Sequence, residues 1–192
     1  MVPKDVNTAC VALLGHPHSL YGGTMDNKVI TTLVRACSAL RIPSLRFNFR
    51  GVGQSAGIYD AGQGESEDML YLVSLWLQGA PNAQLLFAGF SFGSYVTYLA
   101  AVKSHSALLL SLAPPVHHFD FTTDLEQPYP WIILQGDEDE VVSLQDVLNF
   151  SKQYALPVIR MPNTGHFFHG KLLDLKTLLI ETMTNQGFYD LN

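Results

Sequence analysis

Short apolar runs alternate with longer amphipathic segments along most of the chain. The runs that suit buried strands are 9–14, 44–49, 84–88, 107–112, 131–135 and 157–161. Between them, apolar residues recur at helical spacing over 26–40, 65–78, 92–103, 144–153 and 171–184. Strands that alternate with helices of this length predict βαβ units. We therefore expect an α/β fold with a mostly parallel central sheet and helices on both faces.

In open sheets of this kind, ligands bind beyond the carboxyl ends of the strands. The loops that follow those ends are 15–25, 50–64, 89–93, 113–129, 136–142 and 162–170, and they hold most of the unusual residues. The 113–129 loop is too short to be a helical cap domain. The functional site is thus expected in these loops, without a cap above it.

Composition narrows the class of protein. The 192 residues, 47% of them hydrophobic, suit a single domain over 1–192 with a real core. A net charge of −6 disfavours nucleic acid as a partner. Cys10 and Cys37 lie in apolar segments and make no disulfide framework, and no apolar run reaches the length of a membrane span. We expect a cytoplasmic protein, with the oligomeric state left open, a homodimer included.

The strongest motif is Gly-Phe-Ser-Phe-Gly at 89–93. It follows a predicted strand and precedes a predicted helix, which is the setting of the nucleophile turn in α/β-hydrolases. Glycines on either side let the turn pack tightly and raise the serine hydroxyl above the sheet. Ser91 is therefore the predicted nucleophile.

A serine nucleophile needs a base, and the base needs an orienting acid; in this fold they follow in the order serine, acid, histidine. The strand at 131–135 leads into a turn with four acidic residues, of which turn register favours Asp139 and leaves Asp137 as the alternative. His166 follows a glycine in the loop before the last helix and is the predicted base, with His169 as its competitor.

The oxyanion of an acyl-transfer reaction needs two N–H donors. Phe92, directly after the nucleophile, is one candidate; His18, in the loop after the first strand, is the other, with Ser19 as second choice. Five further residues are candidates to line the substrate site: His16, Arg50, His117, His118 and His169. Arg50 would contact an acidic substrate or pair with a carboxylate such as Asp60 or Glu65.

Two other binding functions are disfavoured by spacing. No third residue follows His16 and His18 at a sequence spacing typical of metal ligands, so no metal site is expected. The glycines at 51, 53 and 57 miss the spacing of a dinucleotide fingerprint, and no helix opens directly after them. We expect no cofactor.

Several segments together resemble one family: His-Pro-His at 16–18, and the stretches 22–29, 46–53, 89–93, 113–116 and 166–170. The set is similar to the small bacterial predicted α/β-superfamily hydrolases, near dienelactone-hydrolase-like and Xaa-Pro-dipeptidyl-peptidase-like domains, from about 9 to 180. The resemblance implies an α/β-hydrolase fold without a cap, a Ser-Asp-His triad and ester-type hydrolysis. This chain is expected to differ from the family in one respect, because the family's N-terminal β-hairpin is trimmed here.

These observations predict a serine hydrolase that cleaves a small carboxylic ester or thioester through an acyl-enzyme on Ser91. Its partner would be a small acyl substrate. Two alternatives stay open: a short-peptide peptidase of Xaa-Pro type, and a non-catalytic binding protein on the same fold. A broken triad would be the mark of the latter.

Overall fold

The computed structural model describes residues 9–122 and 129–189. Within these residues, six strands form one sheet in the order β2-β1-β3-β4-β5-β6, and all neighbours pair in parallel. The strands are β1 (Cys10–Gly15), β2 (Ser44–Arg46), β3 (Gln84–Phe90), β4 (Ser106–Leu112), β5 (Trp131–Gly136) and β6 (Val158–Met161). The helices are α1 (Lys28–Ala39), α2 (Gln63–Gly79), α3 (Phe92–Val102), α4 (Leu144–Gln153) and α5 (Leu172–Asn185), with a short 3-10 helix η1 (Ser19–Tyr21).

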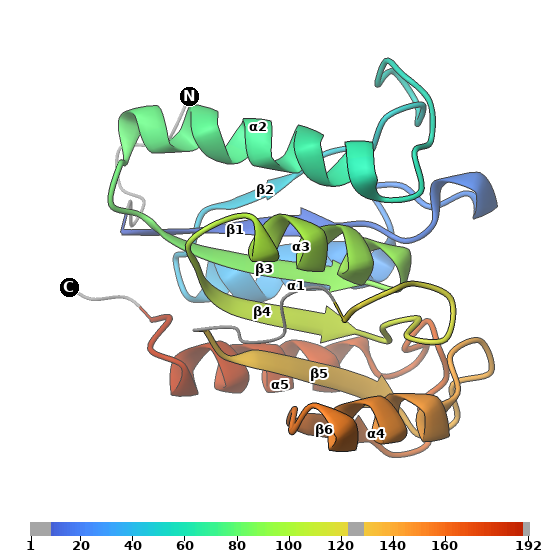
Figure 1. The fold of residues 1–192 in the computed structure, drawn as a ribbon. Coiled ribbons are helices and arrows are strands. Elements are labelled where there is room, and N and C mark those ends of the chain that lie inside the picture. The colour runs from blue at the N-terminus through green and yellow to red at the C-terminus, as the bar shows by residue number, and fades with distance from the viewer. Residues whose placement is uncertain (1–8, 123–128, 190–192) are drawn as a thin grey trace.

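The helices cover both faces of the sheet. Helices α1 and α5 pack against one face, and α2, α3 and α4 against the other (Figure 1). Side chains of each strand alternate between the two layers, so in β1 Ala12 and Leu14 face α1 while Val11 and Leu13 face α3. The predicted fold class, an α/β fold with helices on both faces, is confirmed, and all the described strand pairs are parallel.

Strand β2 is shorter than the predicted 44–49 and ends at Arg46. The Arg46 guanidinium donates to the carbonyl of Met25 over 2.9 Å and lies 3.1 Å from the carboxylate of Asp26. Further on, the N–H of Phe49 donates to the ring of His16. The chain after β2 is thus bound to the loops that follow β1 instead of continuing the sheet.

Helix α2 begins at Gln63, two residues before the predicted start. Gly62 precedes it with a φ of 96°, which favours glycine. The buried carboxylate of Glu65 accepts the N–H groups of Asp60 and Gly62, each over 2.9 Å. The end of the 50–64 loop is therefore fixed against the first turn of α2.

The loops that follow the carboxyl ends of the strands gather at one edge of the sheet (Figure 1). The described part of the chain between β4 and β5 contains no helix that would cover this edge. The expectation of a trimmed hairpin concerns the chain before β1, where 1–8 lie outside the described residues. Each described helix is too short or too polar to cross a membrane.

Candidate active site

Ser91 lies in a tight turn between β3 and α3. Its φ of 53° and ψ of −125° are a conformation that L-residues rarely adopt, at a cost of about 1 to 3 kcal/mol. The surrounding bonds hold it there, because its N–H donates to Leu112 over 2.8 Å and its carbonyl accepts the hydroxyl of Ser94 over 2.6 Å. A Cβ at Gly89 or at Gly93 would lie 2.1 Å from a backbone oxygen. Both glycines of the motif are therefore required by close backbone approach.

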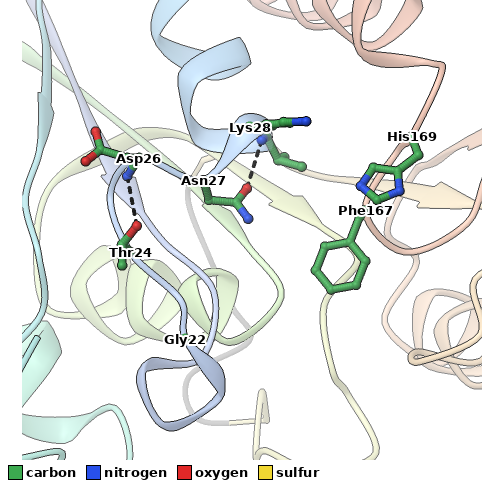
Figure 2. Close-up of a pocket in the computed structure, with 8 residues that line it drawn as sticks. Gly22, Thr24, Asp26, Asn27, Lys28, Phe167 and His169 are labelled. Atoms are coloured by element: carbon green, nitrogen blue, oxygen red, sulfur yellow. Dashed lines mark hydrogen bonds between the residues drawn. The ribbon is translucent and has the colours of Figure 1, made fainter.

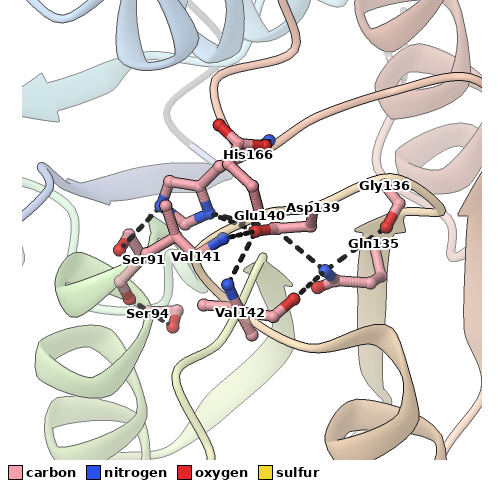
Figure 3. A network of polar contacts seen from close by, with 9 residues as sticks. All are labelled: Ser91, Ser94, Gln135, Gly136, Asp139, Glu140, Val141, Val142 and His166. Atoms are coloured by element: carbon pink, nitrogen blue, oxygen red, sulfur yellow. Dashed lines mark hydrogen bonds and ion pairs between the residues drawn. The ribbon is translucent and has the colours of Figure 1, made fainter.

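Ser91, His166 and Asp139 form one hydrogen-bonded chain (Figure 3). Nε2 of His166 lies 3.2 Å from Oγ of Ser91, and Nδ1 lies 2.9 Å and 3.1 Å from the carboxylate oxygens of Asp139. The side chains of His166 and Asp139 are only 3% and 0% exposed. The structure thus brings together the three residues that the sequence singled out.

The alternative acid, Asp137, lies elsewhere. Its two carboxylate oxygens pair with Nε and Nη2 of Arg160, each over 2.9 Å, at the surface beside β6. No hydrogen bond or ion pair joins Asp137 to His166 in the described part of the chain. The geometry therefore assigns Asp139, and not Asp137, to the histidine. His169, the alternative base, likewise has no bond to Ser91 among the described residues.

Three donors besides His166 hold the carboxylate of Asp139. The N–H groups of Val141 and Val142 donate to one oxygen over 2.9 and 2.7 Å, and Nε2 of Gln135 donates to the other over 3.0 Å (Figure 3). Burial opposes the charge of Asp139, but the hydrogen bonds from His166 and the two valine N–H groups outweigh it and lower the pKa of this carboxyl. Asp139 is therefore held as an anion.

Two of the supporting residues were missed in the sequence. Gln135 is fully buried in the apolar strand β5, and a polar residue in such a strand just before the acidic turn was the available signal. Glu140 accepts the backbone N–H of His166 over 3.1 Å, which fixes the loop that carries the base. The turn at 137–140 holds four acidic residues in a row, so nothing in the sequence singled out Glu140.

The predicted oxyanion donors lie next to the nucleophile. Phe92 is the first residue of α3, so its N–H has no acceptor within the helix. His18 lines the same pocket as Ser91, and its N–H donates to no backbone carbonyl in the described residues.

The ring of His18 stacks on Tyr59 and lies 3.2 Å from the hydroxyl of Tyr59. Burial lowers the pKa of His18, which keeps its ring neutral. Ser19 follows in η1.

The pocket at Ser91 has a volume of about 310 Å³ and is walled mainly by aromatic, aliphatic and glycine residues. Its lining is Pro17, His18, Tyr21, Gly22, Gly23, Asn27, Ser91, Val141, His166 and Phe167. Of the five candidate lining residues, none belongs to this set. His169 comes nearest, because it lines a pocket that adjoins this one.

The other four candidates have different roles. His16 is fully buried and is bonded to the backbone at both ring nitrogens, so it cannot reach a substrate. His117 and His118 lie on the surface, and their rings contact each other in a tilted arrangement with centroids 4.0 Å apart. These predictions were wrong because a histidine in a loop beside the site need not point into it.

Arg50 was also predicted to line the substrate site, and this prediction was wrong. Its guanidinium makes two hydrogen bonds to Asp68, of 2.9 and 2.8 Å, and lies 3.8 Å from Asp60. The hydrogen bonds that Arg50 donates to Asp68 raise the pKa of Arg50. The sequence predicted Asp60 or Glu65 as the partner of Arg50. The main partner is instead Asp68, in the first turns of α2.

Among the described residues, no group of three or more His, Cys, Asp or Glu is placed to hold a metal.

Comparison with known proteins finds relatives at about 40% sequence identity. An uncharacterised protein of Rickettsia prowazekii is 41% identical in an alignment of 144 residues that covers 72% of this chain; the chain spans 60% of that protein's length. An α/β serine hydrolase homologue from Coxiella burnetii is 42% identical, with a TM-score of 0.88 over 94% of this chain and 88% of the other.

A second solved structure is an α/β serine hydrolase without a lid from Xanthomonas campestris. It is 41% identical, with a TM-score of 0.85 over 95% of this chain and 85% of the other. No protein-family model matches the chain. Because these two solved relatives share the fold and over 40% of residues across most of their length, this chain belongs to the α/β serine hydrolases.

Proposed function

We propose that the chain hydrolyses small carboxylic esters or thioesters through an acyl-enzyme on Ser91. The observation that carries this proposal is the chain of hydrogen bonds from Ser91 through His166 to Asp139. Such a chain activates a hydroxyl that is otherwise a weak nucleophile. More distant structures of the same fold include an esterase of Pyrococcus furiosus, at 15% identity, and Est1E of Butyrivibrio proteoclasticus with bound ferulic acid, at 19%.

In the first half-reaction, Oγ of Ser91 attacks the carbonyl carbon and Nε2 of His166 takes its proton. Asp139 holds the Nδ1–H of His166 and stabilises the positive charge that forms on the ring. The N–H groups of Phe92 and His18 stabilise the negative oxygen. His166 then gives its proton to the departing alcohol or thiol, which leaves an acyl group on Ser91.

In the second half-reaction, water attacks the acyl group, with His166 again as base. The same tetrahedral geometry forms and collapses, which frees the acid and restores the hydroxyl of Ser91. Each proton that leaves a nucleophile returns to a leaving group. No group beyond the residues of this chain and water is needed for the balance.

Two features of the pocket favour esters over the alternatives. A peptidase of Xaa-Pro type needs an acidic group for the amino terminus of its substrate, and no carboxylate lines the described pocket at Ser91. A non-catalytic binding protein would not need the 3.2 Å approach of His166 to Ser91, held by a buried carboxylate. The pocket, at about 310 Å³, suits a short acyl chain or one aromatic ring.

The test is a series of p-nitrophenyl esters with acyl chains from acetyl to decanoyl, together with an acetyl thioester. We expect the highest kcat/KM for the short chains, and at least a 10⁴-fold loss of kcat, as an order of magnitude, in Ser91→Ala. Failure of the folded wild-type protein to hydrolyse any of these substrates would contradict the proposal. A kcat/KM that rises steadily with chain length would contradict the assignment to short acyl groups.

A further inference from the structure

A second pocket adjoins the one at Ser91. It has a volume of about 300 Å³ and lies between the segment 22–29, which includes the start of α1, and the loop that carries Phe167 and His169 (Figure 2). Gly22, Asn27 and Phe167 line both pockets, so these residues form the border between them. A substrate held at Ser91 can therefore extend past Phe167 into this second space.

The second pocket carries one positive charge without a counter-charge. Lys28 lines it and is exposed, and no carboxylate of the described residues forms an ion pair with its ammonium. The acidic residue in the lining is Asp26, whose carboxylate lies 3.1 Å from Nη1 of Arg46. That pair is neutral as a whole, and Figure 2 places Asp26 on the side of the pocket away from His169. The charge of Lys28 is thus left for a ligand.

Two further donors complete the surroundings. Oδ1 of Asn27 accepts the N–H of Val29 over 2.8 Å, which assigns the other end of the amide as the NH2 donor. Figure 2 shows that amide nitrogen turned to the side of Phe167. The ring of His169 stacks on Phe167, with centroids 5.8 Å apart, and makes no hydrogen bond to the described residues. An ammonium, an amide NH2 and an imidazole around one hollow are a donor set for an anionic oxygen group.

We infer that this second pocket is a subsite for a carboxylate on the substrate. One uncompensated lysine matches a single negative charge, so a monoanionic carboxylate suits it better than a dianionic phosphate. The inference rests on the proposed function, and it narrows the substrate to an ester with a carboxylate a few atoms from the scissile bond. The pocket at Ser91 then holds the reacting ester, and Phe167 packs against the linker between the two groups.

Binding to the Ser91→Ala protein tests this without turnover. Two pairs of esters differ by a free carboxylate against its neutral methyl ester: p-nitrophenyl hemiglutarate against its methyl ester, and 4-carboxyphenyl acetate against its methyl ester. The first pair places the carboxylate on the acyl arm and the second on the alcohol arm. By calorimetry we expect the anionic member of at least one pair to bind about three- to fivefold more tightly, with a preference that weakens as ionic strength rises.

Variants identify the residue responsible. In the Ser91→Ala background, Lys28→Met should remove the preference and Lys28→Arg should retain most of it. Lys103→Met is the matched control, because Lys103 is an exposed lysine that caps α3 at the end remote from Ser91, and it should leave the preference intact. Equal binding within both pairs, or a preference that survives in Lys28→Met, would overturn the inference.

Turnover by the protein with Ser91 intact separates this inference from the proposed function. If neutral esters are hydrolysed but kcat/KM shows no advantage for either carboxylate, the subsite is wrong and the hydrolase stands. If no ester is hydrolysed but the charge preference in binding depends on Lys28, the subsite stands and the hydrolysis is wrong.

Discussion

The backbone N–H of Phe49 donates to Nε2 of His16 over 2.9 Å, and the two rings stack with centroids 3.9 Å apart. Because Nε2 is the acceptor, Nδ1 carries the proton and donates to the carbonyl of Pro17 over 2.7 Å. A buried neutral ring thus joins the end of β1 to the loop after β2. Protonation of Nε2 would break the bond to Phe49.

Stability should therefore depend on pH through His16. Burial lowers the pKa of His16 to about 4, against about 6.5 in an unfolded chain. Between about pH 6.5 and 4, His16 is protonated in the unfolded chain but stays neutral in the folded chain. The stabilisation from neutral His16 is therefore complete above about pH 6.5 and is lost as the pH falls towards 4. We expect the free energy of unfolding to fall by about 3 kcal/mol over this range on account of His16.

Urea denaturation at a series of pH values measures this effect. His16→Asn should be less stable at pH 7 and should show a flatter dependence between pH 6.5 and 4. His105→Asn is the control, because His105 is exposed, and it should keep the wild-type slope. The same slope in wild type and in His16→Asn would contradict the account.

The choice between the two aspartates gives a paired prediction. Asp139→Asn should lower kcat by about 10⁴-fold, because the histidine loses the partner that sets its tautomer. Asp137→Asn removes only a surface pair with Arg160 and should change stability by less than about 1 kcal/mol and kcat little. Ester hydrolysis and thermal unfolding of both variants check this. Comparable losses of kcat would refute the assignment of Asp139.

Gln135 is expected to act as a positioning residue for Asp139. Gln135→Leu removes a donor to a buried carboxylate, and we expect kcat to fall about tenfold with little change in KM. Because the effect acts through Asp139, the double variant Gln135→Leu/Asp139→Asn should be no slower than Asp139→Asn alone. Gln145→Leu, at an exposed position of α4, is the control. Additive losses in the double variant would show a merely structural role.

The nucleophile turn should tolerate no side chain at Gly93. A Cβ there would lie 2.1 Å from the carbonyl oxygen of Gly15 and 2.5 Å from that of His16, both of them backbone atoms. We expect Gly93→Ala to destabilise the fold by about 2 to 3 kcal/mol. Gly79→Ala, at the end of α2 with nothing within 4 Å of the new Cβ, should be neutral or slightly stabilising. Similar melting temperatures for the two variants would rule out the crowding argument.

Much of the fold could be predicted because it depends on local pattern. The alternation of strands and helices, and the glycine turn around Ser91, are visible in the sequence and fix which loops meet at the carboxyl edge of the sheet. Side-chain partners could not be predicted in the same way. Arg50 turned to Asp68 on α2, and His16 to the backbone of Phe49, because of approaches that only the folded chain creates.

The candidate site shows the same division. Turn register separated Asp139 from Asp137, since an acid must follow β5 at a set distance to meet the histidine. The side-chain NH2 of Gln135 donates to the carboxylate of Asp139 and to the carbonyl of Val142, both in the turn after β5. These bonds form only when the turn folds back over Gln135, so the sequence does not show them. The pocket at Lys28 likewise joins two loops that are far apart in the sequence.

Labelling with a fluorophosphonate tests the central claim, that Ser91 is an activated nucleophile. Intact-mass and peptide mass spectrometry should show one covalent adduct, on Ser91, in the folded wild-type protein. The adduct should be absent in Ser91→Ala, strongly slowed in His166→Ala and unchanged in Ser104→Ala. A folded wild-type protein that takes up no label, or a label that persists in Ser91→Ala, would contradict the account.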